Sequence, residues 1–136
     1  MERILVIGAN GQIGSELVEA LAEIHGEENV IAGDIGARSL AGAQRYETLD
    51  VLDSTRLAQV IDSNGITQVY QLAALLSVTG EQAPLRAWTL NMNGLLNILE
   101  IARERTAAGK PLRVFWPSSI AAFGPHTPAV ETPQLT

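Results

Sequence analysis

The stretch Gly8-Ala9-Asn10-Gly11-Gln12-Ile13-Gly14 decides the fold. It follows a short apolar run, residues 3–7, that resembles a buried parallel strand. It opens a segment, residues 12–25, in which Ile13, Leu17, Ala20, Leu21 and Ile24 recur at helical spacing. A strand, a glycine-rich turn and a helix in this order predict the first unit of a dinucleotide-binding sheet.

Each glycine of the turn has a separate expected role. Gly8 permits the tight turn, Gly11 lets the backbone approach a pyrophosphate, and Gly14 lets the helix pack closely on the strand. The N–H groups and the positive dipole end of the helix would face the phosphates. We therefore predict a cofactor site formed by Gly8, Asn10, Gly11, Gln12, Ile13 and Gly14. The alternative, a glycine-rich turn without a ligand, is less favoured because an acidic residue follows at the right distance.

That acidic residue is Asp34, at the end of a second predicted strand, residues 29–34. A carboxylate there accepts hydrogen bonds from the adenosine ribose hydroxyls, and it repels a 2′-phosphate. Asp34, with Ile35 beside it, therefore predicts NAD rather than NADP as the cofactor. Arg38 follows closely, and we interpret it as a solvated loop residue.

Strands and helices alternate along the rest of the chain. Further strands are expected at 46–49, 68–72 and 112–116, a helix at 54–64 capped by Ser54, and a long helical segment at 81–108 with Pro84 in its first turn. Apolar residues recur in that segment at spacings of three and four: Leu85, Trp88, Met92, Leu95, Leu96, Leu99 and Ala102. The pattern predicts an α/β fold, a Rossmann-type doubly wound parallel sheet with strand order 3-2-1-4-5. Residues 1–124 would form the NAD-binding domain, and residues 125–136 a loop rich in Pro and Thr.

More candidate ligand-binding residues follow the later strands. Asp50 and Val51 would flank the adenine ring, although Asp50 capping its own loop is an equal alternative. The small residues of Leu72-Ala73-Ala74 would let backbone approach the cofactor, although they also suit plain core packing. Ser118 and Ser119 stand where a hydroxyl would orient a substrate oxygen, although two serines after a strand are more often loop residues.

The composition excludes several classes of protein. The net charge is −6 and the nine basic residues are scattered, which argues against nucleic-acid binding and against an anionic membrane surface. There is no cysteine, no signal-peptide pattern and no apolar run of membrane-spanning length. His25 and His126 lack metal-ligand spacing, so no metal site is expected. The expectation is a cytoplasmic domain.

Together these segments resemble the extended short-chain dehydrogenases, because Gly8–Gly14, Asp34, Leu72-Ala73-Ala74 and residues 117–124 (PSSIAAFG) all match that family. Residues 75–81 (LLSVTGE), 91–94 (NMNG) and 123–125 (FGP) resemble the L-threonine 3-dehydrogenases of the short-chain type in particular. The resemblance covers the whole chain.

The resemblance implies oxidation of the L-threonine β-hydroxyl to 2-amino-3-ketobutyrate, with hydride transfer to NAD. It implies that Ser119 is the catalytic serine, that Ser77 and Ser118 lie beside the small polar substrate, and that Asn91 supports a proton relay near the cofactor. For Asn91, capping a helix kink is an equally good interpretation. The resemblance also implies a homodimer formed through one face of the 81–108 segment.

One departure from the family pattern concerns the catalytic base. These enzymes use a tyrosine and a lysine four residues later, where the lysine lowers the pKa of the phenol. Here the only lysine is Lys110, and neither Tyr46 nor Tyr70 precedes a lysine at that spacing. We therefore expect a chain truncated before the sixth strand and the substrate domain, and inactive by itself. The alternatives are an NAD-dependent sugar-nucleotide epimerase or dehydratase, and a non-catalytic nucleotide-binding protein.

Overall fold

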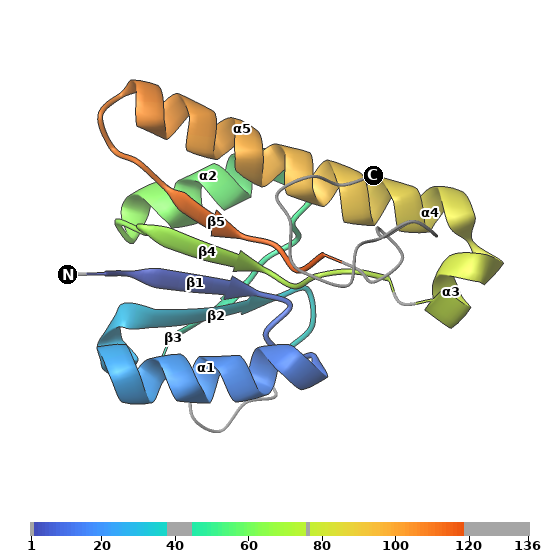
Figure 1. The fold of residues 1–136 in the computed structure, drawn as a ribbon, viewed down its shortest axis with the longest axis horizontal. Helices are drawn as coiled ribbons and strands as arrows, with labels where there is room; N and C mark the ends of the chain where they lie inside the picture. The colour runs from blue at the N-terminus through green and yellow to red at the C-terminus, as the bar shows by residue number, and fades with distance from the viewer. Residues whose placement is uncertain (1, 38–44, 76, 119–136) are drawn as a thin grey trace, which may run out of the picture.

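The strands form one parallel sheet at the centre of the molecule. The computed structural model describes residues 2–37, 45–75 and 77–118. The strands are β1 (Ile4–Ile7), β2 (Val30–Asp34), β3 (Arg45–Thr48), β4 (Gln68–Gln71) and β5 (Arg113–Phe115). They lie in the order β3-β2-β1-β4-β5 (Figure 1), which confirms the predicted Rossmann-type topology. The predicted domain boundary at residue 124 and the loop 125–136 lie outside the described residues.

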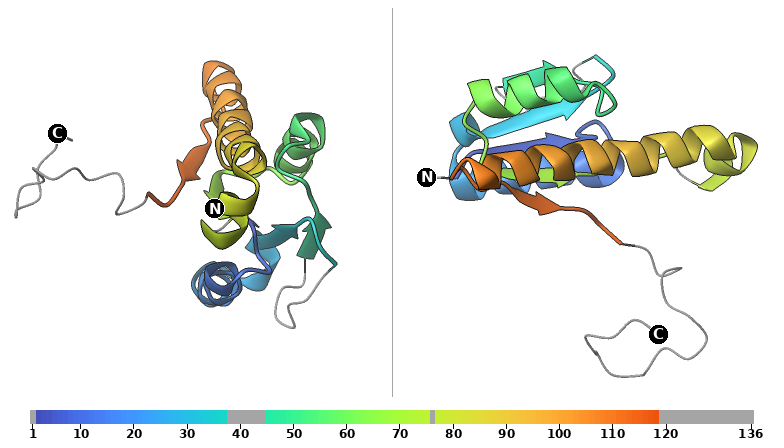
Figure 2. Two further views of the ribbon diagram at one scale, coloured as in Figure 1. Left: turned by 90° about the vertical axis from the view of Figure 1, so that its right-hand side faces the viewer. Right: turned by 90° about the horizontal axis from the view of Figure 1, so that it is seen from above.

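Helices cover both faces of this sheet. They are α1 (Gln12–His25), the 3₁₀ turn η1 (Glu27–Asn29), α2 (Ser54–Ser63), α3 (Ser77–Gln82), α4 (Pro84–Trp88), the π-helical turn η2 (Thr89–Asn93) and α5 (Gly94–Ala107). Helix α1 lies on one face, and α2 and α5 lie on the other (Figure 1). Helices α3 and α4 project beyond the carboxyl ends of the strands (Figures 1 and 2).

Strand β1 is buried on both faces, which explains its continuous apolar run. Ile4 and Val6 belong to the core under α1, whereas Leu5 and Ile7 belong to the core under α2 and α5. The four residues pair with Val30–Gly33 of β2 on one side and with Gln68–Gln71 of β4 on the other. The strand is therefore fixed at the centre of the sheet, and the glycine turn begins directly after its carboxyl end.

The face that α1 buries differs from the apolar pattern in the sequence. Gly14, Val18 and Leu21 are its buried residues, while Ile13 and Ile24 are 68% and 73% exposed. The helix must approach the strand at Gly14, and this contact rotates the two isoleucines toward solvent. In α2, by contrast, the buried residues Leu57, Val60 and Ile61 follow the three- and four-residue spacing of an amphipathic helix.

The predicted helical segment 81–108 is divided into α4, η2 and α5 and preceded by α3. Its recurrent apolar residues do not form one buried face, because Leu85, Trp88, Leu96 and Leu99 are exposed. The buried residues of α5 are Gly94, Leu95, Ile98 and Ile101. The five-residue π turn shifts the register between α4 and α5, and a pattern of threes and fours does not anticipate such a turn.

The N-cap of α2 is Asp53, and not Ser54 as the sequence suggested. The Asp53 carboxylate accepts a hydrogen bond from the Arg56 backbone N–H at 2.9 Å. We expect Asp53→Ala to lower the free energy of unfolding by about 1 kcal/mol, because a helix N–H loses its acceptor. Urea unfolding would measure this, with Ser54→Ala as a near-neutral control. Equal losses for the two variants would contradict the assignment of the cap.

The described part of the chain contains neither a membrane-spanning helix nor a metal-binding cluster. No helix there is long and apolar enough to cross a membrane. No group of three or more His, Asp or Glu side chains is arranged to hold a metal ion there.

Candidate functional site

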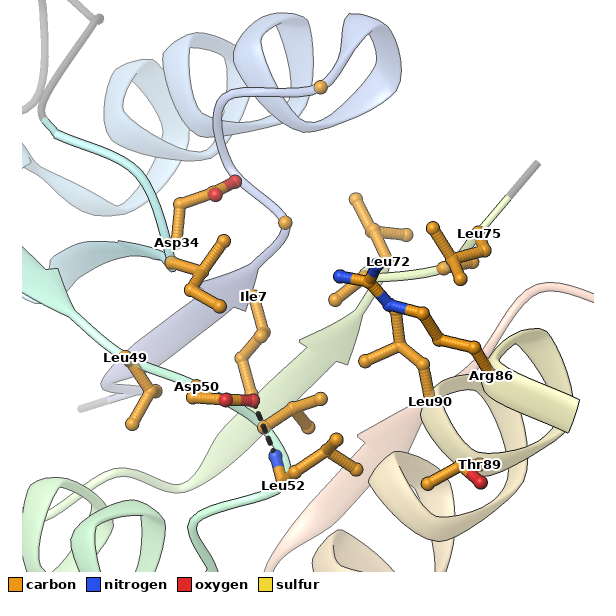
Figure 3. A pocket seen from close by; sticks show the side chains of 16 residues that line it. Ile7, Asp34, Leu49, Asp50, Leu52, Leu72, Leu75, Arg86, Thr89 and Leu90 are labelled. Atoms are coloured by element: carbon orange, nitrogen blue, oxygen red, sulfur yellow. Dashed lines mark hydrogen bonds between the residues drawn. The ribbon is translucent and has the colours of Figure 1, made fainter. Parts of the chain in front are cut away.

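A cleft of about 420 Å³ opens at the carboxyl ends of β1, β2 and β4. Side chains from the strand ends, from the loop after β3 and from α4 and η2 line it (Figure 3). The lining residues are Ile7, Gly8, Gly11, Asp34, Ile35, Leu49, Asp50, Val51, Leu52, Leu72, Ala73, Ala74, Leu75, Arg86, Thr89 and Leu90. The connection after β1 leads to β2 on one side of it, and the connection after β3 returns to β4 on the other side. The cleft therefore lies at the switch point of the sheet, where such folds bind ligands.

The glycine turn needs the absence of side chains at two positions. Gly8 has φ of +84°, and a Cβ there would lie 2.7 Å from the backbone nitrogen of Ala73. A Cβ on Gly14 would lie 2.2 Å from the carbonyl oxygen of Gly8. Gly11 is the N-cap of α1 and lines the cleft. The turn therefore packs on the end of β4 and keeps the helix N-terminus close to β1.

The first turn of α1 presents three backbone donors. The N–H groups of Gln12, Ile13 and Gly14 have no hydrogen-bond acceptor within residues 2–37, 45–75 and 77–118. The next N–H group, that of Ser15, bonds the Gly11 carbonyl at 3.0 Å. Unpaired donors at the positive end of a helix dipole suit an anion such as a diphosphate. Gln12, Ile13 and Gly14 themselves do not line the cleft.

A closed ring of hydrogen bonds holds Asp34 beside the glycine turn. Its Oδ2 accepts the Asn10 backbone N–H at 3.0 Å, and its Oδ1 accepts the Gly36 N–H at 3.2 Å. The Tyr46 hydroxyl donates to the Gly36 carbonyl at 2.8 Å and accepts from the Asn10 side-chain amide at 3.0 Å. Asp34 thus has a fixed orientation and unused lone pairs for a further donor.

Tyr46 completes this ring, although nothing in the sequence marks it as a site residue, because a strand tyrosine ordinarily indicates packing. Partial burial raises the pKa of the Tyr46 phenol, and the Asp34 carboxylate raises it further, against the lowering effect of the hydrogen bond from Asn10. The phenol therefore stays a neutral donor to the loop after β2 at neutral pH.

The loop after β3 forms a second wall of the cleft. Asp50 accepts the Leu52 N–H at 2.9 Å (Figure 3), so it caps its own loop and lines the cleft as well. The Asn97 side chain of α5 donates to the Val51 carbonyl at 3.0 Å. Gly94 lets α5 approach, since a Cβ there would lie 2.8 Å from a Val51 methyl. Contacts with α5 therefore fix the position of the loop after β3.

The end of β4 forms the floor of the cleft through Leu72, Ala73 and Ala74. Asn91 does not line the cleft. Its side chain instead holds the chain just beyond Ala74: Oδ1 accepts the Leu75 N–H at 2.9 Å, and Nδ2 donates to the Leu75 carbonyl at 3.4 Å. Because Asn91 stands in the π turn, these contacts agree with the alternative of an asparagine that stabilises a helix irregularity.

Of the three predicted serines, the structure describes Ser77 and Ser118. Ser119 lies outside the described residues. Ser77 is the first residue of α3, and Ser118 is exposed after β5 without lining the cleft. Their catalytic and substrate-binding roles therefore stay predictions.

Arg86, Thr89 and Leu90 line the cleft although the sequence analysis did not select them. They come from α4 and η2, which the sequence presents as an amphipathic helix with no motif. The signal that would have found them is the topology, because a helix that follows β4 begins at the ligand-binding edge of the sheet.

The chain belongs to the NAD dependent epimerase/dehydratase family, which it matches over residues 4–136. The description of the family names NAD, the cofactor that the sequence predicted.

Several individual proteins are similar to the chain. A GalE-like L-threonine dehydrogenase from Cupriavidus necator, in its holo form, is 57% identical with a TM-score of 0.83; the match covers 97% of this chain and 42% of that chain. An L-threonine dehydrogenase from Clostridium difficile is 44% identical with a TM-score of 0.86, covering 100% of this chain and 42% of that chain. An uncharacterized epimerase/dehydratase of Staphylococcus saprophyticus is 46% identical and covers all of this chain. The chain spans 42% of the length of that curated relative.

The residues that line the cleft, together with the first turn of α1 beside it, fit this dinucleotide. The three unpaired N–H groups suit the diphosphate, and the fixed Asp34 carboxylate suits ribose hydroxyls. The apolar wall formed by Val51, Ala73 and Leu90 offers a surface for an aromatic base.

Proposed function

We propose that this chain is the NAD-binding portion of an NAD-dependent L-threonine 3-dehydrogenase. The observation that carries the NAD assignment is the combination of unpaired N–H groups at the N-terminus of α1, whose N-cap Gly11 lines the cleft, with the fixed Asp34 carboxylate in the same cleft. The 57% identity with the Cupriavidus necator threonine dehydrogenase supports the substrate assignment. Bound NAD would supply the acceptor for the hydride that leaves the carbon bearing the substrate hydroxyl.

The chain's residues would divide the work between binding and orientation. The backbone of residues 12–14 would hold the diphosphate, Asp34 the adenosine ribose, and the Asp50–Val51 wall the adenine. Ser119 would hydrogen-bond the substrate hydroxyl, with Ser77 and Ser118 beside the rest of the substrate. The sequence contains no tyrosine followed four residues later by a lysine, so it does not itself supply the base for the hydroxyl proton.

Exposed apolar surface on β5 supports the proposal that the chain is a portion of a larger enzyme. Phe115 and Trp116 are 49% and 45% exposed, although the Phe115 ring contacts that of Tyr70 at a centroid distance of 5.3 Å. Covering these rings would bury apolar area that is now in water.

A second candidate function is a sugar-nucleotide epimerase or dehydratase, and the Staphylococcus relative, whose name is epimerase/dehydratase, favours it. Such an enzyme uses the same glycine turn and the same serine position. A third candidate is a non-catalytic nucleotide-binding protein. The three candidates share the NAD cleft. They differ in the substrate: threonine for the first, a sugar nucleotide for the second and none for the third.

The test is calorimetric titration of this chain with NAD, NADP and ADP-ribose, followed by an assay for NAD reduction. We expect NAD and ADP-ribose to bind and NADP to bind more weakly. We expect no threonine-dependent NAD reduction, because the chain lacks the tyrosine–lysine pair. Absence of NAD binding would overturn the cofactor assignment. Measurable turnover would show that another group provides the base, and oxidation of a sugar nucleotide by the full-length parent would favour the second candidate.

We also propose that the exposed apolar face of the long helical segment pairs with the same face of a second copy. Its exposed apolar residues are Leu85 and Trp88 of α4 and Leu96 and Leu99 of α5. A closed dimer would cover them and leave no complementary apolar surface free for further association.

A charged residue on that face should break the pairing. We expect Leu96→Glu to shift the sedimentation coefficient from dimer to monomer while the circular dichroism spectrum is unchanged, because Leu96 is 54% exposed. Ile24→Glu on α1, another exposed apolar position, is the control. A wild-type monomer, or a dimer that persists in the Leu96 variant, would contradict the proposal.

A further inference from the structure

Arg86 is the only positively charged residue that lines the cleft in the described part of the chain. The other charged lining residues are Asp34 and Asp50, and both use their carboxylates to accept backbone N–H groups. The Arg86 guanidinium has no salt bridge and no hydrogen bond within residues 2–37, 45–75 and 77–118. Its charge is therefore available to a ligand.

The position of Arg86 follows from the helical segment that precedes α5. Helix α4 stands beyond the carboxyl ends of the strands (Figures 1 and 2), and its residue Arg86 lines the cleft there. Figure 3 shows the Arg86 side chain extending from α4 toward Leu72, across the cleft from Asp34. Leu72 in turn meets the glycine turn, because a Cβ on Gly8 would lie 2.8 Å from the Leu72 carbonyl carbon. The guanidinium thus points toward the turn that precedes the unpaired N–H groups.

We propose that Arg86 binds the diphosphate of NAD from the side opposite to the N-terminus of α1. This inference rests on the proposed NAD site and adds a residue to it. The N–H groups of α1 supply only partial charges, and the net charge of the chain is −6, so a dianionic diphosphate gains from one full positive charge at short range. A guanidinium also matches two phosphate oxygens at once.

The removal of Arg86 should therefore affect phosphate-containing ligands selectively. We expect Arg86→Leu to weaken NAD and ADP binding roughly 10- to 30-fold by calorimetry, the range for a charge-assisted hydrogen bond at a partly exposed site. Adenosine, which has no phosphate, should bind equally to both proteins in an NMR titration. Arg86→Lys keeps the charge and should recover part of the loss. Added salt should reduce NAD affinity less in Arg86→Leu than in the wild-type protein.

Arg103→Leu is the matched control, because Arg103 is an exposed arginine of α5 that pairs with Glu100 far from the cleft. Unchanged NAD affinity in Arg86→Leu, or a loss equal to that of Arg103→Leu, would overturn the proposal and leave the NAD site intact. An equal loss for adenosine would overturn it as well, since Arg86 would then act on the base. A wild-type protein that binds neither NAD nor ADP would refute the NAD site and this inference together.

Discussion

Replacement of Gly14 by alanine should lower the free energy of unfolding by about 3 kcal/mol, the upper range for forcing an extra group into a packed site. The new Cβ would lie 2.2 Å from the Gly8 carbonyl oxygen and 2.8 Å from the Ala9 Cα. Neither atom can retreat easily, because the N–H groups of Gly8 and Ala9 both donate to the Gly33 carbonyl, at 2.9 and 3.1 Å. The substitution therefore pushes α1 away from β1.

Whether Gly14→Ala lowers or raises the free energy of unfolding distinguishes the effect of packing from that of helix propensity. Gly14 is a helical residue, and propensity alone predicts that alanine stabilises the protein by up to about 1 kcal/mol. Urea unfolding measures the difference, with Gly80→Ala in α3 as the control, since a Cβ at Gly80 would make only an ordinary contact at 3.5 Å with the Ala87 Cβ. A neutral or stabilising Gly14→Ala would show that the helix does not need its close approach to the strand.

The sheet was predictable because its local and global signals agree. Apolar runs, the glycine turn and helical spacing all indicate one alternating pattern, and the rules for crossovers leave few strand orders. The strand ends that carry Asp34, Asp50 and Leu72 then meet at one edge, so the order of the strands brings together residues that are far apart in the sequence.

The helix faces were less predictable because each depends on a contact that periodicity does not encode. Ile13 turns to solvent because the contact at Gly14 sets the rotation of α1. The π turn at Thr89–Asn93 accompanies the bonds between Asn91 and Leu75. It separates α4, whose Arg86 lines the cleft, from α5, whose Leu96 is exposed. Side chains such as Tyr46 and Arg86 became candidates only once the topology had placed them.

Substitution of Asp34 by asparagine should weaken NAD binding about 30- to 100-fold, with a much smaller effect on folding. A side-chain amide has one oxygen, so it can still accept from one of the two backbone N–H groups, that of Asn10 or that of Gly36, and loses the bond to the other. The hydrogen bonds of Tyr46 to Gly36 and Asn10 do not involve this side chain and are kept. The amide loses the negative charge, and with it the strong hydrogen bonds that a carboxylate accepts from two ribose hydroxyls. Asp34→Ala removes both functions and should therefore cost stability as well as affinity.

The most direct test of the role of Asp34 is the ratio of NAD affinity to NADP affinity. A carboxylate beside the ribose repels a 2′-phosphate, so Asp34→Asn should lower the preference for NAD while it lowers NAD affinity. Glu23→Gln, on the exposed surface of α1, removes one negative charge elsewhere and should leave both affinities unchanged. An Asp34→Asn protein that retains its NAD affinity and its discrimination against NADP would show that the dinucleotide does not place its ribose at this carboxylate. The orientation of the cofactor in the cleft, with adenine on the Val51 wall and the diphosphate between α1 and Arg86, would then have to be reversed.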